Sequence, residues 1–133
     1  MARIHDKLMS CLKKRDMLND AEADANILVL EAEKFWKAGY IQDALEFFAK
    51  AKSEKGIEQV VALAVEEGDF FVAESATKAL GRDLGPSQWE ALGEKAMGKA
   101  QYYFAFKAFT RAGDMEKSET ARGYVEENGL HLG

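Results

Sequence analysis

The sequence predicts an all-α fold, and three observations carry that prediction. Only one proline stands among 133 residues, so little interrupts a helix. Glycines fall between the apolar segments, where helices commonly end. Apolar residues recur at intervals of three and four, which is typical of amphipathic helices. Two such runs are Ile4, Leu8, Cys11 and Leu12, and Ala44, Phe47, Phe48 and Ala51.

Eight short helices follow from this pattern, in the order 3–17, 21–38, 41–53, 56–67, 70–81, 86–98, 101–112 and 115–128. The first is basic and the last, within "EKSETARGYVEENG", is polar, so each suits the end of a stack. Short turns join the six between them as antiparallel pairs. Helix ends are assigned to Gly39, Gly56, Gly68, Gly81, Gly85, Gly113 and Gly129.

The chain also shows internal repetition. Three segments align: "GYIQDALEFFAKA" (39–51), "GDFFVAESATKAL" (68–80) and "AQYYFAFKAFTRA" (100–112). Each has a small first residue, an apolar residue two positions later and an alanine five positions later. The helices before them align through Leu28, Ala32 and Phe35, through Ile57, Val61 and Ala64, and through Trp89, Gly93 and Ala96. Such periods predict stacked helical hairpins.

The third unit resembles the tetratricopeptide repeat, whose pattern is W-x2-L-G-x2-Y followed by G-x-Y-x2-A-x3-F-x2-A-x4-P. The matching residues are Trp89, Leu92, Gly93, Tyr102, Ala105, Phe109 and Ala112, while Ala96, Ala100 and Lys117 depart from it. The repeat alanines lie 29 and 32 residues apart, whereas the family period is about 34. A related hairpin solenoid, such as those of vesicle-coat subunits, is the alternative.

This resemblance covers about residues 25–129 and implies one domain, 1–133, built as a right-handed α-α superhelix. Residues 1–20 would form an N-terminal cap, residues 21–113 three helix-turn-helix repeats, and residues 114–133 a C-terminal cap. Close helix crossing requires small side chains at the contact. Gly93 and Ala105 supply them, and Trp89, Tyr102 and Phe109 fill the space on either side.

Charge and cysteine content limit the partner and the compartment. Residues 1–18 carry a net charge of +3, which leaves −8 on the remainder of a chain whose total is −5. An acidic body disfavours nucleic acid and favours a basic protein surface. Cys11 is the only cysteine, so no disulfide can form within the chain, and a reducing, cytoplasmic setting is expected. No apolar run is long enough to span a membrane.

Motifs for chemistry are weak throughout the chain. "GEKAMGKA" (93–100) resembles a phosphate-binding loop, but alanine replaces the hydroxyl residue and the segment lies within an expected helix. His5, His131 and Cys11 lack the spacing of metal ligands. The cluster Tyr102, Tyr103, Phe104, Phe106 and Phe109 is interpreted as core and not as a base-stacking platform. We therefore expect no catalytic residues, no metal and no cofactor.

The resemblance also implies a peptide groove lined by the first helix of each unit. Its positions are Val29, Glu33, Trp36 and Lys37, then Glu58, Ala62, Val65 and Glu66, then Glu90, Glu94, Met97 and Gly98. Glutamates replace the cations that clamp a carboxylate in that family. The prediction is an acidic groove with Trp36, Val65 and Met97 as apolar anchors for a basic or amphipathic segment. Alternatively, the glutamates only confer solubility and Trp36 packs under the first helix.

Two classes of function stay open at this point. One is a non-catalytic scaffold or adaptor whose groove binds a protein or peptide. The other is a structural subunit that self-assembles into a homo-oligomer, with the basic first helix of one chain on the acidic body of another, or that completes a longer solenoid.

Overall fold

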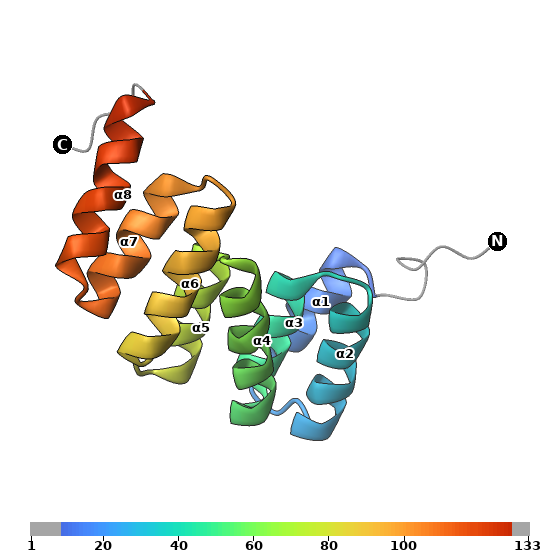
Figure 1. Ribbon diagram of the computed structural model, residues 1–133. Helices are drawn as coiled ribbons and strands as arrows, with labels where there is room; N and C mark the ends of the chain where they lie inside the picture. Colours follow the sequence, from blue (N-terminus) through green and yellow to red (C-terminus); the bar gives the residue numbers. More distant parts are fainter. Residues whose placement is uncertain (1–8, 129–133) are drawn as a thin grey trace. The chain divides into compact units, whose positions relative to one another are not determined.

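The computed structural model describes residues 9–128, and within them it contains eight helices and no strand (Figure 1). The predicted all-α fold is therefore confirmed. The helices are α1 (Cys11–Asn19), α2 (Ala25–Lys37), α3 (Ile41–Lys50), α4 (Glu54–Glu67), α5 (Phe70–Leu80), α6 (Pro86–Gly98), α7 (Tyr102–Ala112) and α8 (Met115–Glu127). The chain forms two compact units, Met1–Val60 and Val61–Gly133, so that α4 begins in the first and ends in the second.

The start of the chain differs most from the sequence prediction. Among the described residues, the first helix begins at Cys11, because the side chain of Ser10 accepts a hydrogen bond from the Lys13 amide and caps it. The prediction that residues 9 and 10 are helical was wrong, and residues 3–8 lie outside the described range. No residue of α1 is buried, and Leu12 is 63% exposed. The apolar face predicted for this helix is thus not buried at Cys11 or Leu12.

One turn geometry recurs at five of the connections between consecutive helices in the described range. In each case the residue after the left-handed position donates its amide to the carbonyl five residues earlier, and the left-handed residue donates to the carbonyl three residues earlier. The five donor–acceptor pairs of the first kind are Tyr40–Phe35, Ser53–Phe48, Asp69–Ala64, Gln101–Ala96 and Asp114–Phe109. Gly39, Gly68 and Gly113 provide three of the left-handed residues, whereas Lys52 and Ala100 adopt φ of 56° and 60°. The left-handed conformation of Lys52 and Ala100 is strained, because both residues carry a Cβ atom.

The N-terminal unit is built on the α2–α3 hairpin. Phe35 of α2 stacks on Phe47 of α3 with ring centroids 5.3 Å apart, and both rings are buried. Gly56 lies within α4 and not at a helix end as predicted. A Cβ atom on Gly56 would stand 2.1 Å from Phe48, so glycine is required where α4 crosses that ring. Lys14 of α1 binds Asp43 of α3.

The C-terminal unit arranges its helices in two layers (Figure 1). In one layer, the Lys99 ammonium at the end of α6 donates to the Glu67 carbonyl of α4 at 2.6 Å, and Ala96 of α6 packs in one cluster with Ala121 of α8. In the other, Phe70 of α5 stacks on Phe104 of α7. The predicted close crossing is confirmed between α6 and α7, where a Cβ atom on Gly93 would lie 2.7 Å from the Phe109 ring.

Candidate functional site

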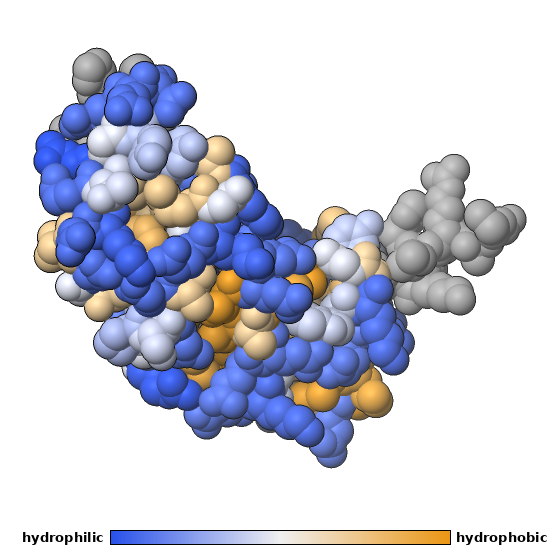
Figure 2. Space-filling model, viewed as in Figure 1, coloured by the Kyte–Doolittle hydropathy of each residue, from blue (hydrophilic) through white to orange (hydrophobic). Residues whose placement is uncertain are grey.

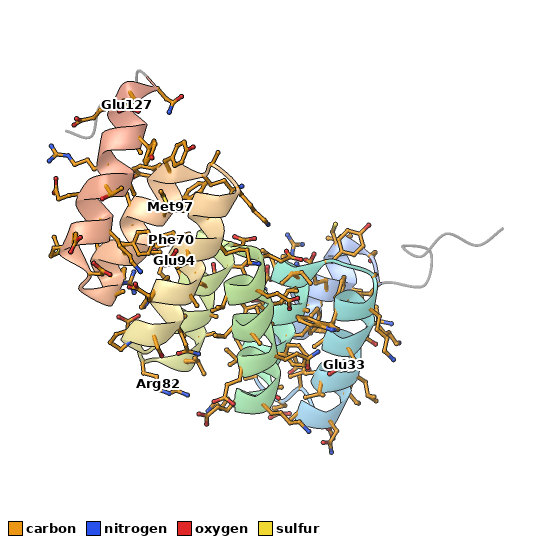
Figure 3. The ribbon with its side chains drawn as sticks, viewed as in Figure 1. Glu33, Phe70, Arg82, Glu94, Met97 and Glu127 are labelled. Carbon is orange, nitrogen blue, oxygen red and sulfur yellow. The ribbon has the colours of Figure 1, made fainter. Side chains whose placement is uncertain are left out.

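The predicted groove positions are divided between the two units. The N-terminal unit holds Val29, Glu33, Trp36 and Lys37 of α2 and Glu58 of α4, whereas the C-terminal unit holds Ala62, Val65 and Glu66 of α4 and Glu90, Glu94 and Met97 of α6. Within the first group Val29, Glu33 and Trp36 are partly buried. In the second, Ala62, Glu66 and Glu94 are exposed. Figure 3 shows Glu94 and Met97 on α6.

Two of the predicted glutamates are bound within the same unit. The Lys117 ammonium of α8 lies 2.7 Å from Glu90 Oε1 and 2.5 Å from Glu94 Oε1. The hydrogen bonds to Glu90 and Glu94 and their negative charges raise the pKa of Lys117 far above its usual range. Lys117 therefore offsets one of the two negative charges of Glu90 and Glu94. The binding of a partner by this face stays a prediction.

Met97 has a structural contact in addition to its predicted role as an anchor. It packs against the buried cluster of Ala96, Ala105, Phe109 and Ala121, and its side chain is only partly exposed. The residue therefore extends the core toward the α6–α8 face. Flexible thioether side chains fill such edges readily.

The segment that resembles a phosphate loop has no loop geometry. Gly93 to Gly98 are the last residues of α6, and Gly93 is buried against Phe109. The amides of a helix interior are already paired, so they cannot cradle a phosphate. Among residues 9–128 no group of three or more His, Cys, Asp or Glu side chains could hold a metal ion.

The aromatic side chains of α5 and α7 form a second candidate surface. Phe104 of α7 contacts Phe70 and Phe71 of α5, with ring centroids 6.4 and 5.1 Å away, and lies 5.8 Å from Tyr103. Phe70 is buried, whereas Phe71 is 65% and Tyr103 39% exposed. The prediction that the aromatic cluster is core holds for Phe109 but was wrong for Tyr103.

Two adjoining hollows lie on this surface and share Phe70, Phe71 and Phe104. One, of about 400 Å³, is lined by Phe70, Phe71, Glu74, Ser75 and Lys78 of α5 and by Tyr103, Phe104 and Lys107 of α7. The other, of about 200 Å³, lies at the start of both helices and includes Asp69, Lys99 and Gln101. Together they form a groove along α5 and α7, which we call the aromatic groove.

The buried Trp89 supports the aromatic groove from behind. Its ring lies 5.4 Å from that of Phe70, and its indole nitrogen donates a hydrogen bond to Asp83 at 2.9 Å. The Arg111 guanidinium stacks over the same indole at 4.5 Å and also donates to Asp83 at 2.9 Å. Partial burial acts to raise the pKa of Asp83, but the hydrogen bonds from Trp89 and Arg111 outweigh it and lower the pKa below its ordinary value of 3.8.

Cations line the aromatic groove without carboxylate partners. The Lys107 ammonium lies 5.5 Å from the Phe70 ring centroid and 5.6 Å from that of Tyr103. Neither Lys107 nor Lys78 belongs to an ion pair in the described part of the chain. The one carboxylate lining the larger hollow, Glu74, lies 3.7 Å from Arg111. The larger hollow thus has an apolar base with Lys78 and Lys107 at its edge, whereas Glu67 and Asp69 line the smaller hollow.

Sequence reasoning missed this site, although the sequence contains a weak signal for it. Phe70 and Phe71 are adjacent on a helix, where neighbouring side chains point about 100° apart. Such a pair can direct one ring away from the core, as with Phe71 here, but Phe47 and Phe48 on α3 are adjacent and both buried, so the pair alone does not predict exposure. Tyr103 and Phe104 repeat that arrangement on α7.

Comparison with known proteins yields no relative for this chain: no family model, curated protein or solved structure gives a significant match. The helices within residues 9–128 include none that is both long and apolar enough to cross a lipid bilayer. The functional inference therefore depends on the site itself.

Proposed function

We propose that this chain is a non-catalytic interaction module, built from tetratricopeptide-like helical hairpins, that binds a segment of another protein. The single observation that carries the proposal is the aromatic groove, where Phe71 and Tyr103 are exposed over a buried aromatic base. Exposed aromatic side chains clustered in a groove mark binding surfaces more often than scattered apolar residues do.

Several features support the repeat architecture within this proposal. The Gly68, Ala100 and Gly113 turns share one hydrogen-bond pattern, and the two layers of the C-terminal unit place α6 beside α8 and α5 beside α7. Such stacking leaves continuous helix faces open, which repeat proteins use for binding. The exposed, single Cys11 suits a reducing compartment such as the cytoplasm.

The experiment that tests the proposed function is a peptide-display selection on the purified chain. A random library is selected against the wild-type protein, and each enriched peptide is then measured against a Phe71→Ser, Tyr103→Ser double variant. We expect enriched peptides that bind the wild-type protein at least about tenfold more tightly than the variant, because the replaced rings form the groove wall. Failure to enrich any peptide, or equal affinity for both proteins, would contradict the proposal.

Self-assembly is a second candidate, favoured by exposed apolar residues in the N-terminal unit. Ile27 is 52% and Leu30 63% exposed one turn apart on α2, and Figure 2 shows an apolar area over the start of that helix. Lys14, which was expected to help dock the basic helix on another chain, binds Asp43 and Glu46 of its own chain. Sedimentation equilibrium of the wild type and an Ile27→Ser, Leu30→Ser variant tests this: self-assembly requires oligomers that the variant loses.

A further inference from the structure

We infer that the aromatic groove binds an amphipathic helix of about three turns whose apolar stripe is flanked by acidic residues. This inference rests on the proposed function and specifies the partner's chemistry. It differs from the acidic groove predicted from the sequence, because the charge preference is the opposite and the surface belongs to α5 and α7.

The shape of the aromatic groove determines the form of the partner. Phe70 lies beside Phe104, and further along the same helices Glu74 lies beside Arg111, so α5 and α7 run side by side in the same direction. Each helix has 11 residues, which corresponds to a groove of about 16 Å. A third helix of about 11 residues would lie along that length, with apolar residues at i, i+3, i+4 and i+7 on the rings.

The charged residues of the groove determine which charge the partner helix should carry. Lys107 stands over two aromatic rings, and Lys78 lies one turn beyond Glu74 on α5. Arg111 lies 3.7 Å from Glu74 and 2.9 Å from Asp83. Three cations (Lys78, Lys107 and Arg111) therefore stand against two carboxylates, which leaves one positive charge beside the larger hollow. Asp69 and Glu67 line the other hollow, at the start of α5, where the Asp69 carboxylate accepts from the Val72 amide. Positive charge is therefore concentrated in the larger hollow, toward Lys78.

A partner carboxylate that approaches Lys107 from the side away from the rings would form an ion pair with its ammonium. The ring faces already attract the ammonium, and a docked helix would exclude water from the pair, which strengthens the interaction between opposite charges. A lysine at the same position of the partner would instead face two like charges. Charge therefore decides specificity here, while the exposed rings of Phe71 and Tyr103 supply most of the buried apolar area.

Three synthetic peptides of roughly 14 residues test the inference directly. All three carry the same leucine and phenylalanine stripe, and their flanking positions are all glutamate, all glutamine or all lysine, residues of similar helix propensity. Fluorescence anisotropy with the full chain gives each affinity at low and moderate salt. We expect the glutamate peptide to bind about tenfold or more tightly than the lysine peptide, and salt to reduce that difference.

Two charge-reversal variants locate the preference. The Lys78→Glu, Lys107→Glu variant should invert the order of the glutamate and lysine peptides. The matched control, Lys13→Glu, Lys55→Glu, changes the net charge equally at exposed positions outside the groove and should keep the order. Circular dichroism confirms that both variants retain their helices.

Other results would overturn the inference. These are the absence of binding by every peptide, equal affinity for the glutamate and lysine peptides, and equal effects of the two charge reversals. The proposed function is judged separately, because displayed peptides that require Phe71 and Tyr103 but lack acidic residues would support it while contradicting this partner chemistry.

Discussion

On the α6–α8 face of the C-terminal unit, Lys117 binds Glu90 and Glu94, whereas on the α5–α7 face Lys78 and Lys107 have no carboxylate partner among the described residues. The apolar side chains differ in the same way. Met97 packs into the core on the first face, but Phe71 and Tyr103 are exposed on the second.

This difference teaches that charged residues on one face can already form ion pairs within the chain, so their number alone does not indicate a binding surface. The family resemblance placed the partner on the first helix of each unit, which includes α6, and the glutamates there, such as Glu90 and Glu94, predicted a basic or amphipathic partner. The structure shows that Glu90 and Glu94 share one cation of the same chain, Lys117. In contrast, Phe71 and Tyr103 on the α5–α7 layer are exposed. Unsatisfied groups identify a candidate binding surface better than charge alone does.

The largest expected effect comes from removing the buried indole ring that packs behind the aromatic groove. Trp89→Ala deletes a side chain with no exposed area and leaves the Phe70 ring without its neighbour. We expect the free energy of unfolding to fall by about 3–5 kcal/mol in chemical denaturation. Trp36→Ala, at a partly buried position of the N-terminal unit, is the control and should cost less. A loss below about 1 kcal/mol for Trp89→Ala would contradict this account of the core.

A smaller loss is expected where α6 and α7 cross. Gly93→Ala places a methyl group 2.7 Å from the Phe109 ring, so the two helices must separate. We expect a loss of about 1–3 kcal/mol in the free energy of unfolding. Gly123→Ala is the matched control within α8, because its added methyl group meets no atom within 4 Å and should raise stability by about 0.5–1 kcal/mol. Equal effects of the two substitutions would show that the crossing is not tight.

Asp83 should give a pH-dependent effect. Because its pKa in the folded protein lies below the ordinary value of 3.8, its contribution is complete above that pH and is lost as the pH falls through the lowered pKa. Asp83→Asn should therefore unfold more easily than the wild type near neutral pH, with the difference shrinking below pH 3.8. Thermal unfolding across pH 2 to 7 measures this. A difference that is constant with pH would exclude the charged interaction with Arg111.

The smallest expected effect on folding is that of Lys117→Gln, since Lys117 is exposed at the surface and such ion pairs contribute little. The substitution frees the charges of Glu90 and Glu94, so a lysine-rich peptide should bind the variant more tightly than the wild type at low salt. Isothermal titration calorimetry compares the two proteins. Unchanged affinity would remove the acidic groove on α6 from consideration.

Much of the fold could be predicted from the sequence because its signals are local. Apolar spacing gave seven of the helices with ends close to those observed, and small residues such as Gly93 marked a real helix crossing. Gly56 was interpreted as a helix end, but its small size serves contact with Phe48 and not a turn. Glycine both ends helices and allows close helix contact, and its position between apolar residues does not show which of the two roles applies.

The candidate site was harder to predict because it depends on which side chains remain uncovered. Lys117 and Glu90 lie 27 residues apart, so their pairing cannot be deduced from helix periodicity. Likewise, Lys107 approaches Phe70 only because α5 and α7 are neighbours in one layer. Such relations follow from tertiary packing, which sets the exposure and charge of each position.

The most direct test of the central claim is a nuclear magnetic resonance titration of the isotopically labelled full chain with the glutamate-flanked peptide. Our account predicts that the resonances of Phe71, Tyr103 and Lys107 shift with increasing peptide, while those of Glu66 and Glu94 remain in place. Shifts centred on Glu66 and Glu94, with unchanged Phe71 and Tyr103, would contradict it.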